Sequence, residues 1–468
     1  MSIPIQHKDQ LFASLPPIQS DMANPSMSNL FNQKIDTIIV LDDDPTGTQT
    51  VDGVPVLTSW SKDILVQEFK KRTPVFYLLT NSRSLTETAS IELTQKIGQQ
   101  IKIAAQITET RYWVISRSDS TLRGHYPAEM DALKASLGFK NGVEFIIPAF
   151  FEGGRYTIKN VHYVLQGDEM VPAAETIYAK DHVFAYQSSN LVDWIIEKTK
   201  GKVNRAEIET FDIPMLRQNT KDALVKKLNK LQSNTICIVN AASYADLYAF
   251  SMALSQASIQ PIFRTAASFV KAIAGLSTKP LLGKAALIKN ERHGGLIVVG
   301  SYVATTTRQL NHLMKASLNL ISIEISIPKI LELEGTDVYV NLLGRQIDQH
   351  LVAGKSVVLY TSRNLISAQS DDAKQQIGQK VSQIVTDIIK AIQIQPAFLL
   401  TKGGITSSDV ATKGLSIKRA MVMGQLIKGV PVWKLGTETK FPDSIQIIFP
   451  GNVGQDDSLT EIVRKLTS

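Results

Sequence analysis

The chain has 468 residues, of which 44% are hydrophobic and 20% charged, and its formal net charge at pH 7 is +7. This length suggests about two to three domains with sizeable cores, and the composition is that of an ordinary globular protein. The lysines and arginines are dispersed instead of gathered in basic tracts, so we expect no nucleic acid partner. No apolar run reaches the roughly 18 residues of a membrane helix, so we expect no membrane partner either.

The cysteine content and residues 1–35 indicate the cellular compartment. Cys237 is the single cysteine of the sequence, which excludes an intramolecular disulfide and fits a reducing compartment. It stands in the apolar run 235–239, so we expect a buried structural thiol. Residues 1–35 are polar, contain four prolines and lack a basic start followed by an apolar stretch, which argues against a secretory signal. We therefore expect a cytoplasmic protein with a flexible extension over residues 1–35.

Short apolar runs alternate with helical patterns along the chain, which favours parallel α/β sheets. A helix is predicted over residues 371–393, because its apolar residues recur at three- and four-residue steps. Breakers and charges between Ser277 and Gly295 predict a domain boundary there. We expect two α/β domains, 36–280 and 281–468, each with a mostly parallel sheet flanked by helices and with a ligand cleft between them. The predicted strands cover residues 37–41, 75–79, 112–115, 145–147, 236–239, 296–299, 357–360, 398–400 and 445–449.

The first predicted strand, 37–41, ends on Asp42, Asp43 and Asp44, which a Pro-Thr-Gly turn follows. Open α/β sheets place their ligands at the carboxyl ends of the strands. Three adjacent carboxylates repel one another unless a cation or hydrogen-bond donors meet them. The pattern therefore indicates a site for a metal ion, a polyol or a phosphate, with an acidic turn in solvent as the simpler alternative.

A competing interpretation of the same residues is a phosphatase. Asp42, Asp44 and Thr46 satisfy D-x-D-x-T after a strand, which resembles the nucleophile motif of haloacid-dehalogenase-type phosphatases. In that case Asp42 would be phosphorylated and Asp44 would act as acid and base, with Mg²⁺ between them. Such enzymes need a later acidic pair at a strand end, and neither 167–169 nor 456–457 supplies it convincingly. The phosphatase stays open as an alternative.

A second polar constellation, residues 116–125, follows the predicted strand 112–115. The arginine fork suits a carboxylate, and short hydroxyl and carboxylate side chains suit sugar hydroxyls. A helix start with Ser120 or Thr121 as its N-cap is the alternative, and both interpretations can hold together. His125 is as readily structural as functional. The candidate binding residues here are Arg117, Ser118, Asp119, Ser120, Thr121 and Arg123.

Two more polar loops follow predicted strands of the same half. Arg83 lies in the loop after strand 75–79, and Glu152 and Arg155 lie in the loop after strand 145–147. Because carboxyl ends of parallel strands share one sheet edge, we expect these side chains to reach the same ligand as the aspartates.

The C-terminal half carries three glycine-rich turns after predicted strands. Glycines let backbone N–H groups approach a phosphate, and helix N-termini favour its charge, so the turns indicate a nucleotide polyphosphate. Thr406 and Asp409 are spaced as a capping box. No Walker P-loop and no strand-linked G-x-G-x-x-G occurs. The three turns lie within residues 299–307, 400–409 and 447–454.

On these motifs, from about Thr37 to the C-terminus, the chain resembles the four-carbon acid sugar kinases. The resemblance implies a sugar-acid-binding domain over 36–280 and a nucleotide-binding domain over 281–468. The residues that it implies for nucleotide binding are Ser301, Gly403, Gly404, Ile405, Thr406, Gly451, Asn452 and Gly454. It also implies phosphorylation of a small sugar acid such as threonate, erythronate or 3-oxo-tetronate, with ATP and Mg²⁺ as cofactors. The chain departs from the family pattern in the added Asp42 and in Pro45, Gly153, Phe449-Pro450 and Val453.

Asp43 and Asp44 are the expected catalytic pair, since either carboxylate could accept the proton of the reacting hydroxyl or bind the metal through water. The sequence does not specify the metal ligands or the sugar acid. The expected partners are a sugar acid and ATP, with a homodimer as a further expectation. A phosphatase and a catalytically inactive nucleotide and sugar-acid sensor remain the alternative functions.

Overall fold

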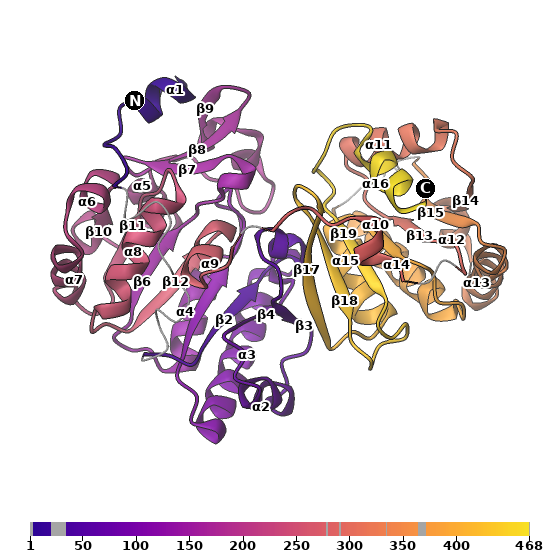
Figure 1. Cartoon of the computed structure of the whole chain (residues 1–468), viewed down its shortest axis with the longest axis horizontal. Coiled ribbons are helices and arrows are strands. Elements are labelled where there is room, and N and C mark those ends of the chain that lie inside the picture. Colours follow the sequence, from indigo (N-terminus) through magenta and orange to yellow (C-terminus); the bar gives the residue numbers. More distant parts are fainter. Residues whose placement is uncertain are drawn as a thin grey trace. The chain divides into compact units, whose positions relative to one another are not determined.

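The computed structural model describes residues 3–19, 34–277, 279–289, 292–333, 335–363 and 371–467, without side chains for 371–375. The chain divides into two compact units (Figure 1). The N-terminal unit comprises Met1–Asp43 and Ser59–Thr278, and the C-terminal unit comprises Asp44–Thr58 and Lys279–Ser468.

The N-terminal unit contains a parallel sheet of the order β10-β11-β6-β12-β5-β2-β4. Its strands are short and apolar, and all of β2, β4 and β6 is buried, as expected for strands covered on both faces. The strands predicted in this half are confirmed, and β10 and β12 are additional. The bounds are β2 Thr37–Asp42, β4 Val75–Leu79, β5 Tyr112–Arg117, β6 Val143–Ile147, β10 Ile208–Phe211, β11 Ile236–Val239 and β12 Pro261–Thr265.

Helices connect these parallel strands, because a parallel pair needs a long crossover. Helices α2, α3 and α4 pack in series, as do α7, α8 and α9. Cys237 lies fully buried in β11, which confirms the structural thiol. The helices of this unit are α2 Lys62–Lys70, α3 Glu87–Thr108, α4 Ala128–Leu137, α5 Leu191–Lys198, α6 Ile213–Gln218, α7 Lys221–Asn229, α8 Tyr244–Gln256 and α9 Ala267–Ile273.

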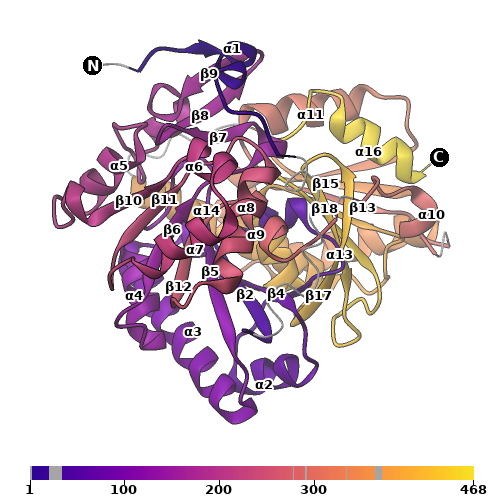
Figure 2. The ribbon, with the colours of Figure 1, turned by 60° about the vertical axis from the view of Figure 1, so that its left-hand side comes forward.

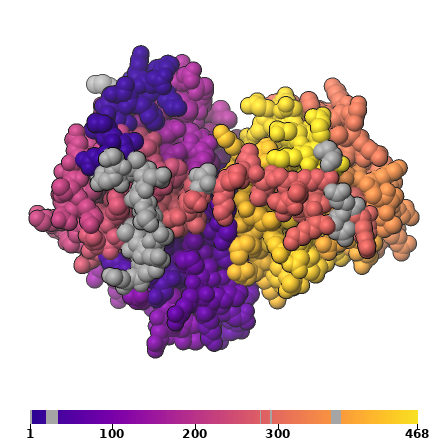
Figure 3. Space-filling view, in the orientation of Figure 1, coloured from indigo at the N-terminus to yellow at the C-terminus, as the bar shows by residue number. Residues whose placement is uncertain are grey.

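A small antiparallel sheet, β1-β9-β8-β7, lies beside the helix α1 Lys8–Ala13 in both views (Figures 1 and 2). Leu11 of α1 is buried in an apolar cluster with Tyr156, Ile158 and Met170. Residues 3–19 of the extension predicted over residues 1–35 thus include a strand and a helix on the surface of this unit (Figure 3), whereas residues 20–33 of that extension lie outside the described residues. The strands are β1 Gln6–His7, β7 Arg155–Ile158, β8 Val161–Gln166 and β9 Glu169–Pro172.

The C-terminal unit contains a mixed sheet of the order β3-β17-β18-β19-β16-β13-β15-β14. The pairs from β19 to β14 are parallel, and those from β3 to β19 are antiparallel. The predicted fold class, two α/β domains with mainly parallel sheets, is confirmed, whereas the predicted cleft stays a prediction. The strands are β3 Pro55–Leu57, β13 Leu296–Val299, β14 Leu320–Ile325, β15 Ser356–Thr361, β16 Leu399–Lys402, β17 Arg419–Ile427, β18 Val430–Leu435 and β19 Ile445–Phe449.

Segment 44–58 belongs to the C-terminal unit although it follows the first strand of the other unit. Its strand β3 pairs with β17, and Trp433 Nε1 donates to Thr48 Oγ1 at 3.1 Å. The predicted helix over 371–393 is confirmed as α14. The helices of this unit are α10 Lys284–Leu287, α11 Ala304–Lys315, α12 Ile327–Glu332, α13 Asp337–Val352, α14 Asp371–Ala391, α15 Gly404–Asp409 and α16 Ser458–Thr467. In the part of the chain that the structure describes, no helix combines the length and apolar character needed to cross a bilayer.

Candidate functional site

Asp43 is the centre of a charged cluster at the carboxyl edge of the N-terminal sheet. It follows β2 directly, and Arg83 follows the neighbouring strand β4. Arg83 binds both oxygens of Asp43, with Nε 3.1 Å from Oδ2 and Nη2 2.5 Å from Oδ1. Ser118, after β5, donates its hydroxyl to Asp43 Oδ2 at 2.6 Å. Three adjacent parallel strands thus bring these three side chains together.

Two further arginines lie buried behind this contact. Arg117, the last residue of β5, donates to Asp42 Oδ1 at 3.2 Å and lies 3.8 Å from Asp43 Oδ1. Arg264 of β12 donates to Glu129 Oε2 at 3.1 Å and to Ser116 Oγ at 3.2 Å. Arg264 is not among the predicted site residues, because β12 itself was not predicted.

The arginines fix the charge state of Asp43. Burial alone would raise the pKa of Asp43, but the charge and hydrogen bonds of Arg83, with the charges of Arg117 and Arg264, hold it below its ordinary value. Asp43 is therefore ionised at neutral pH. It is suited to accept a hydrogen bond from a ligand hydroxyl and is a weak base.

Residues 119–123 form the second part of the cluster. Arg123 Nε donates to Asp119 Oδ2 at 2.7 Å, and the Thr121 hydroxyl donates to the same oxygen. Burial would raise the pKa of Asp119, but Arg83 and Arg123 hold it well below its usual range. The alternative of Ser120 or Thr121 as a helix N-cap was wrong, since α4 begins at Ala128. We call Asp43, Arg83, Arg117, Asp119, Arg123 and Arg264 the arginine cluster.

Two residues distant in sequence hold the carbonyls of this loop. His162 Nε2 lies 2.7 Å from Ser120 O, and its Nδ1 lies 3.0 Å from Thr157 Oγ1. A carbonyl only accepts, so Nε2 carries the proton. Burial lowers the pKa of His162 to about 4, which keeps the ring neutral at pH 7. Tyr186 donates its hydroxyl to Thr121 O at 2.8 Å. No local sequence signal marks either residue.

His125 has the structural role that the sequence left open. It is buried, its Nε2 lies 3.2 Å from Ser82 O, and its ring packs edge-on against Phe184 with centroids 4.9 Å apart.

Glu152 and Arg155 occupy different surroundings although they share one loop. Glu152 accepts hydrogen bonds from Tyr244 at 2.7 Å and from Lys271 at 3.2 Å, so it is tied to α8 and α9. The guanidinium of Arg155 lies 5.8 Å from the Tyr178 ring centroid, and that of Arg123 lies 5.3 Å from it. Tyr178 thus links Arg155 to the arginine cluster. No hydrogen bond or ion pair between described residues joins Glu152 to that cluster.

The three glycine-rich turns of the C-terminal unit converge. A Cβ atom at Gly300 would lie 2.4 Å from Thr406 Oγ1, and one at Gly451 would lie 3.0 Å from Ser301 Oγ. Gly403 has φ +115°, and a Cβ there would lie 2.8 Å from Ser301 Cβ, so only glycine fits this close approach. We call residues 300–301, 403–406 and 451–454 the glycine turns. Ile405 among them is largely exposed, at 66%.

The capping box predicted from Thr406 and Asp409 was wrong. Helix α15 begins at Gly404 with Gly403 as its N-cap, so both residues lie inside the helix. Asp409 instead pairs with Lys413, whose Nζ lies 2.7 Å from Asp409 Oδ1.

Asp44 lies against the glycine turns, next to Gly404. Its Oδ1 accepts from the Thr46 amide at 2.8 Å and from the Thr46 hydroxyl at 2.5 Å. A Cβ atom at Gly404 would lie 3.2 Å from Asp44 Oδ2. The predicted catalytic pair therefore places one carboxylate in the arginine cluster and the other beside the glycine turns.

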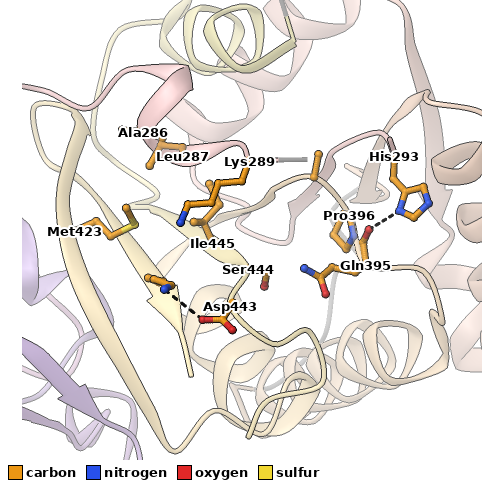
Figure 4. A pocket seen from close by; sticks show the side chains of 12 residues that line it. Ala286, Leu287, Lys289, His293, Gln395, Pro396, Met423, Asp443, Ser444 and Ile445 are labelled. Atoms are coloured by element: carbon orange, nitrogen blue, oxygen red, sulfur yellow. Dashed lines mark hydrogen bonds and ion pairs between the residues drawn. The ribbon is translucent and has the colours of Figure 1, made fainter. Parts of the chain in front are cut away.

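A cavity of about 260 Å³ lies at the other end of the C-terminal sheet (Figure 4). Its lining includes Lys289, His293, Gln395 and Ile445, which stand at or before the amino ends of β13, β16 and β19. None of the predicted nucleotide-binding residues lines it, so it is separate from the glycine turns.

Comparisons with known proteins match both units. Residues 38–273 match the model of a sugar-binding N-terminal domain, and residues 296–459 match that of a nucleotide-binding C-terminal domain. No curated protein matches the chain. The chain is thus a two-domain sugar- and nucleotide-binding protein. It belongs to the four-carbon acid sugar kinase family, which has this two-domain architecture.

Two crystal structures share the fold. A Haemophilus influenzae protein of the DUF1537 family is 15% identical, with a TM-score of 0.62 over 92% of this chain and 100% of that one. The "putative tRNA synthase" of Salmonella typhimurium LT2 is also 15% identical, with a TM-score of 0.65 over 92% of this chain and 98% of that one.

Proposed function

We propose that the protein is an ATP-dependent kinase that phosphorylates a hydroxyl group of a four-carbon sugar acid. The observation that carries the proposal is the placement of Asp43 and Asp44. These consecutive residues put one carboxylate in the arginine cluster of the sugar-binding domain and the next beside the glycine turns of the nucleotide-binding domain. This placement suits the transfer of a phosphoryl group from a nucleotide to an acceptor hydroxyl.

The arginine cluster supports recognition of a polyhydroxy acid. Arg83 and Arg123 keep 20% and 23% of their side chains exposed, whereas Arg117 is buried to 5% exposure. The two outer arginines can therefore exchange an aspartate partner for the substrate carboxylate, which fits their planar fork. The charge of the buried Arg117 helps to hold the pKa of Asp43 below its ordinary value. The hydroxyl groups of Ser118, Ser120 and Thr121, with the Asp119 carboxylate, match the hydroxyl groups of the acid.

Asp43 is the residue that we propose to orient the reacting hydroxyl. Its low pKa makes it a hydrogen-bond acceptor for that hydroxyl. Phosphoryl transfer through a loose transition state depends mainly on positioning and charge neutralisation, so a weak base is sufficient.

The glycine turns support binding of the phosphates, because their backbone approaches a ligand without side chains in the way. Among the described residues, no three His, Cys, Asp or Glu side chains form a metal site alone. Mg²⁺ needs only one or two carboxylates when phosphates supply other oxygens, and Asp44 beside Gly404 fits this donor set. We propose that Asp44 holds Mg²⁺, directly or through water. Bound there, the ion would neutralise charge on the phosphate oxygens.

The test is an assay with ATP, Mg²⁺ and each of a panel of four-carbon sugar acids, followed by ADP release. We expect ADP release that depends on one acid. Asp43→Asn should lower kcat by roughly 100-fold or more, whereas Asp36→Asn, which removes an exposed aspartate paired with Arg111, serves as the control. Nucleotide binding without turnover on any acid would overturn the kinase in favour of a non-catalytic nucleotide and sugar-acid binding protein.

The phosphatase alternative is tested with the same protein. The Asp42 side chain is only 2% exposed and accepts a hydrogen bond from Arg117, which is unfavourable for a nucleophile that must reach a phosphate. Hydrolysis of sugar phosphates that disappears in Asp42→Asn would support that function instead.

A further inference from the structure

Lys402 is the last residue of β16 and is buried, and it has no part in the sugar-acid, nucleotide or metal binding proposed so far. Its exposure is 0%, and its Nζ lies 3.5 Å from the centroid of the Phe449 ring. The same Nζ donates to Pro450 O at 2.6 Å and lies 3.5 Å from Val453 O. Within the described part of the chain no carboxylate forms an ion pair with it, and burial lowers its pKa to about 7. A buried ammonium without an anionic partner is costly.

Lys402 is one of three side chains that bind carbonyl groups of the turn after β19. Thr306 Oγ1 donates to Gly451 O at 2.8 Å. Gln309 Nε2 donates to Val453 O at 3.0 Å and to Gln455 O at 2.8 Å. Thr306 and Gln309 lie on α11 and are fully buried. Four carbonyls between residues 450 and 455 are therefore bound from within the C-terminal unit.

These bonds determine where the amide groups of the turn point. In a trans peptide the N–H points opposite to the C=O of the preceding residue. A bond from Lys402 to Pro450 O therefore directs the Gly451 N–H away from the lysine, and the bonds to Val453 O do the same for the Gly454 N–H. The backbone hydrogen bonds among described residues include none donated by Gly451 or Gly454. The bond from Thr306 to Gly451 O likewise turns the Asn452 N–H away from α11, so the consecutive amides of residues 451 and 452 can form an anion-binding nest, with Gly454 as a further donor.

We propose that Lys402, Thr306 and Gln309 are positioning residues that hold residues 451–454 as a nest for a phosphate group of the nucleotide. The negative charge of a bound polyphosphate would also favour the protonated form of Lys402 behind the turn. The inference rests on the proposed nucleotide site and extends it to residues that touch the turn and not the ligand.

Nucleotide binding in the absence of a sugar acid tests the proposal. The dissociation constants of ATP, ADP and adenosine are measured by isothermal titration for the wild type and for Lys402→Met, which keeps the side-chain volume and removes the donor. Lys402→Met removes a charged hydrogen-bond donor to the turn and introduces no other donor in its place. We therefore expect ATP to bind about 10- to 100-fold more weakly. ADP should lose less, and adenosine should bind within about twofold of the wild type.

Thr306→Val is the second variant, since it removes a neutral donor of nearly unchanged shape. ATP should bind about three- to tenfold more weakly to it, again without an effect on adenosine. The matched controls are Lys315→Met and Thr307→Val. They change residues of α11, the helix of Thr306, that form no hydrogen bond with the turn. If Lys402→Met does not fold, as judged by its thermal unfolding, Thr306→Val decides the question.

An unchanged ATP affinity in a folded Lys402→Met protein would overturn the proposal. An equal loss for ATP and adenosine would also overturn it, because a lysine that merely supports the fold has no preference for phosphate-bearing ligands. A wild type that binds ATP but phosphorylates no acid would refute the kinase and leave this inference intact.

Discussion

Replacing Arg83 by methionine isolates the contact at the centre of the arginine cluster. The change removes the two hydrogen bonds and the charge that Arg83 gives to Asp43 and leaves that carboxylate buried. Breaking a buried ion pair costs about 3–5 kcal/mol. We expect the lower end, about 3 kcal/mol at neutral pH, because Asp43 keeps the Ser118 hydroxyl and the more distant Arg117 and because Arg83 is itself 20% exposed.

The pH dependence of this loss has a definite sign. The folded-state pKa of Asp43 lies below its unfolded value, so the stability it contributes is fully present above pH about 4 and is lost as the pH falls through the folded pKa. In Arg83→Met the largest lowering influence is gone and burial raises the pKa of Asp43. The difference between wild type and variant should therefore be largest near pH 7, shrink as the pH falls through the raised pKa of the variant, and vanish below the folded pKa of the wild type.

Urea unfolding between pH 3 and 7 measures this difference. Tryptophan fluorescence is a suitable signal, since Trp60, Trp113 and Trp194 lie in the N-terminal unit. Arg111→Met is the matched control: Arg111 also binds both oxygens of an aspartate, Asp36, but on the surface, and exposed pairs contribute little. Equal effects of the two variants, or an Arg83→Met effect that does not depend on pH, would refute the reasoning.

Three other perturbations test separate parts of the structure. Between pH 7 and 5, the free energy of unfolding of the wild type should fall by about 2 kcal/mol more than that of His162→Gln. The folded pKa of His162 is about 4, so in this range only the unfolded chain binds the proton readily. An equal fall in the two proteins, measured by urea unfolding, would contradict this. Leu11→Ala should cost about 2–3 kcal/mol in urea unfolding if α1 belongs to the core, and an effect near zero would show that it does not. Gly403→Ala should weaken ATP binding at least about tenfold, because an alanine there is strained and meets Ser301; Gly378→Ala, in open space on α14, should bind ATP normally.

The sequence predicts strands whose apolar residues run without interruption, because such short runs between turn signals are typical of strands buried on both faces. The missed strands β10 and β12 carry charged residues, Glu209 and Arg264, and their apolar character is interrupted. The pairing of β3 with β17 joins residues more than 350 positions apart. No local pattern marks that pairing, so the assignment of segment 44–58 to the C-terminal unit required the structure.

The candidate site shows a similar division. Asp43, Arg83 and Ser118 come together as predicted, because each follows one of three adjacent parallel strands. Their role in binding a sugar acid stays a prediction. The residues that orient the loops were not predictable. His162 and Lys402 bind backbone carbonyl groups, and because every residue carries such a group, the residue types do not show which one is bound.

The path of the chain has a consequence for how this protein could have been assembled in evolution. The chain passes between the compact units after Asp43, after Thr58 and after Thr278. A gene cut at residue 278 would leave β3 on one fragment and its partner β17, with an unpaired edge prone to aggregation, on the other. Neither compact unit is therefore encoded by one uninterrupted stretch. Recombination that exchanged the nucleotide-binding half alone would also have to replace the short insert that begins with Asp44, so the two halves are expected to be inherited together.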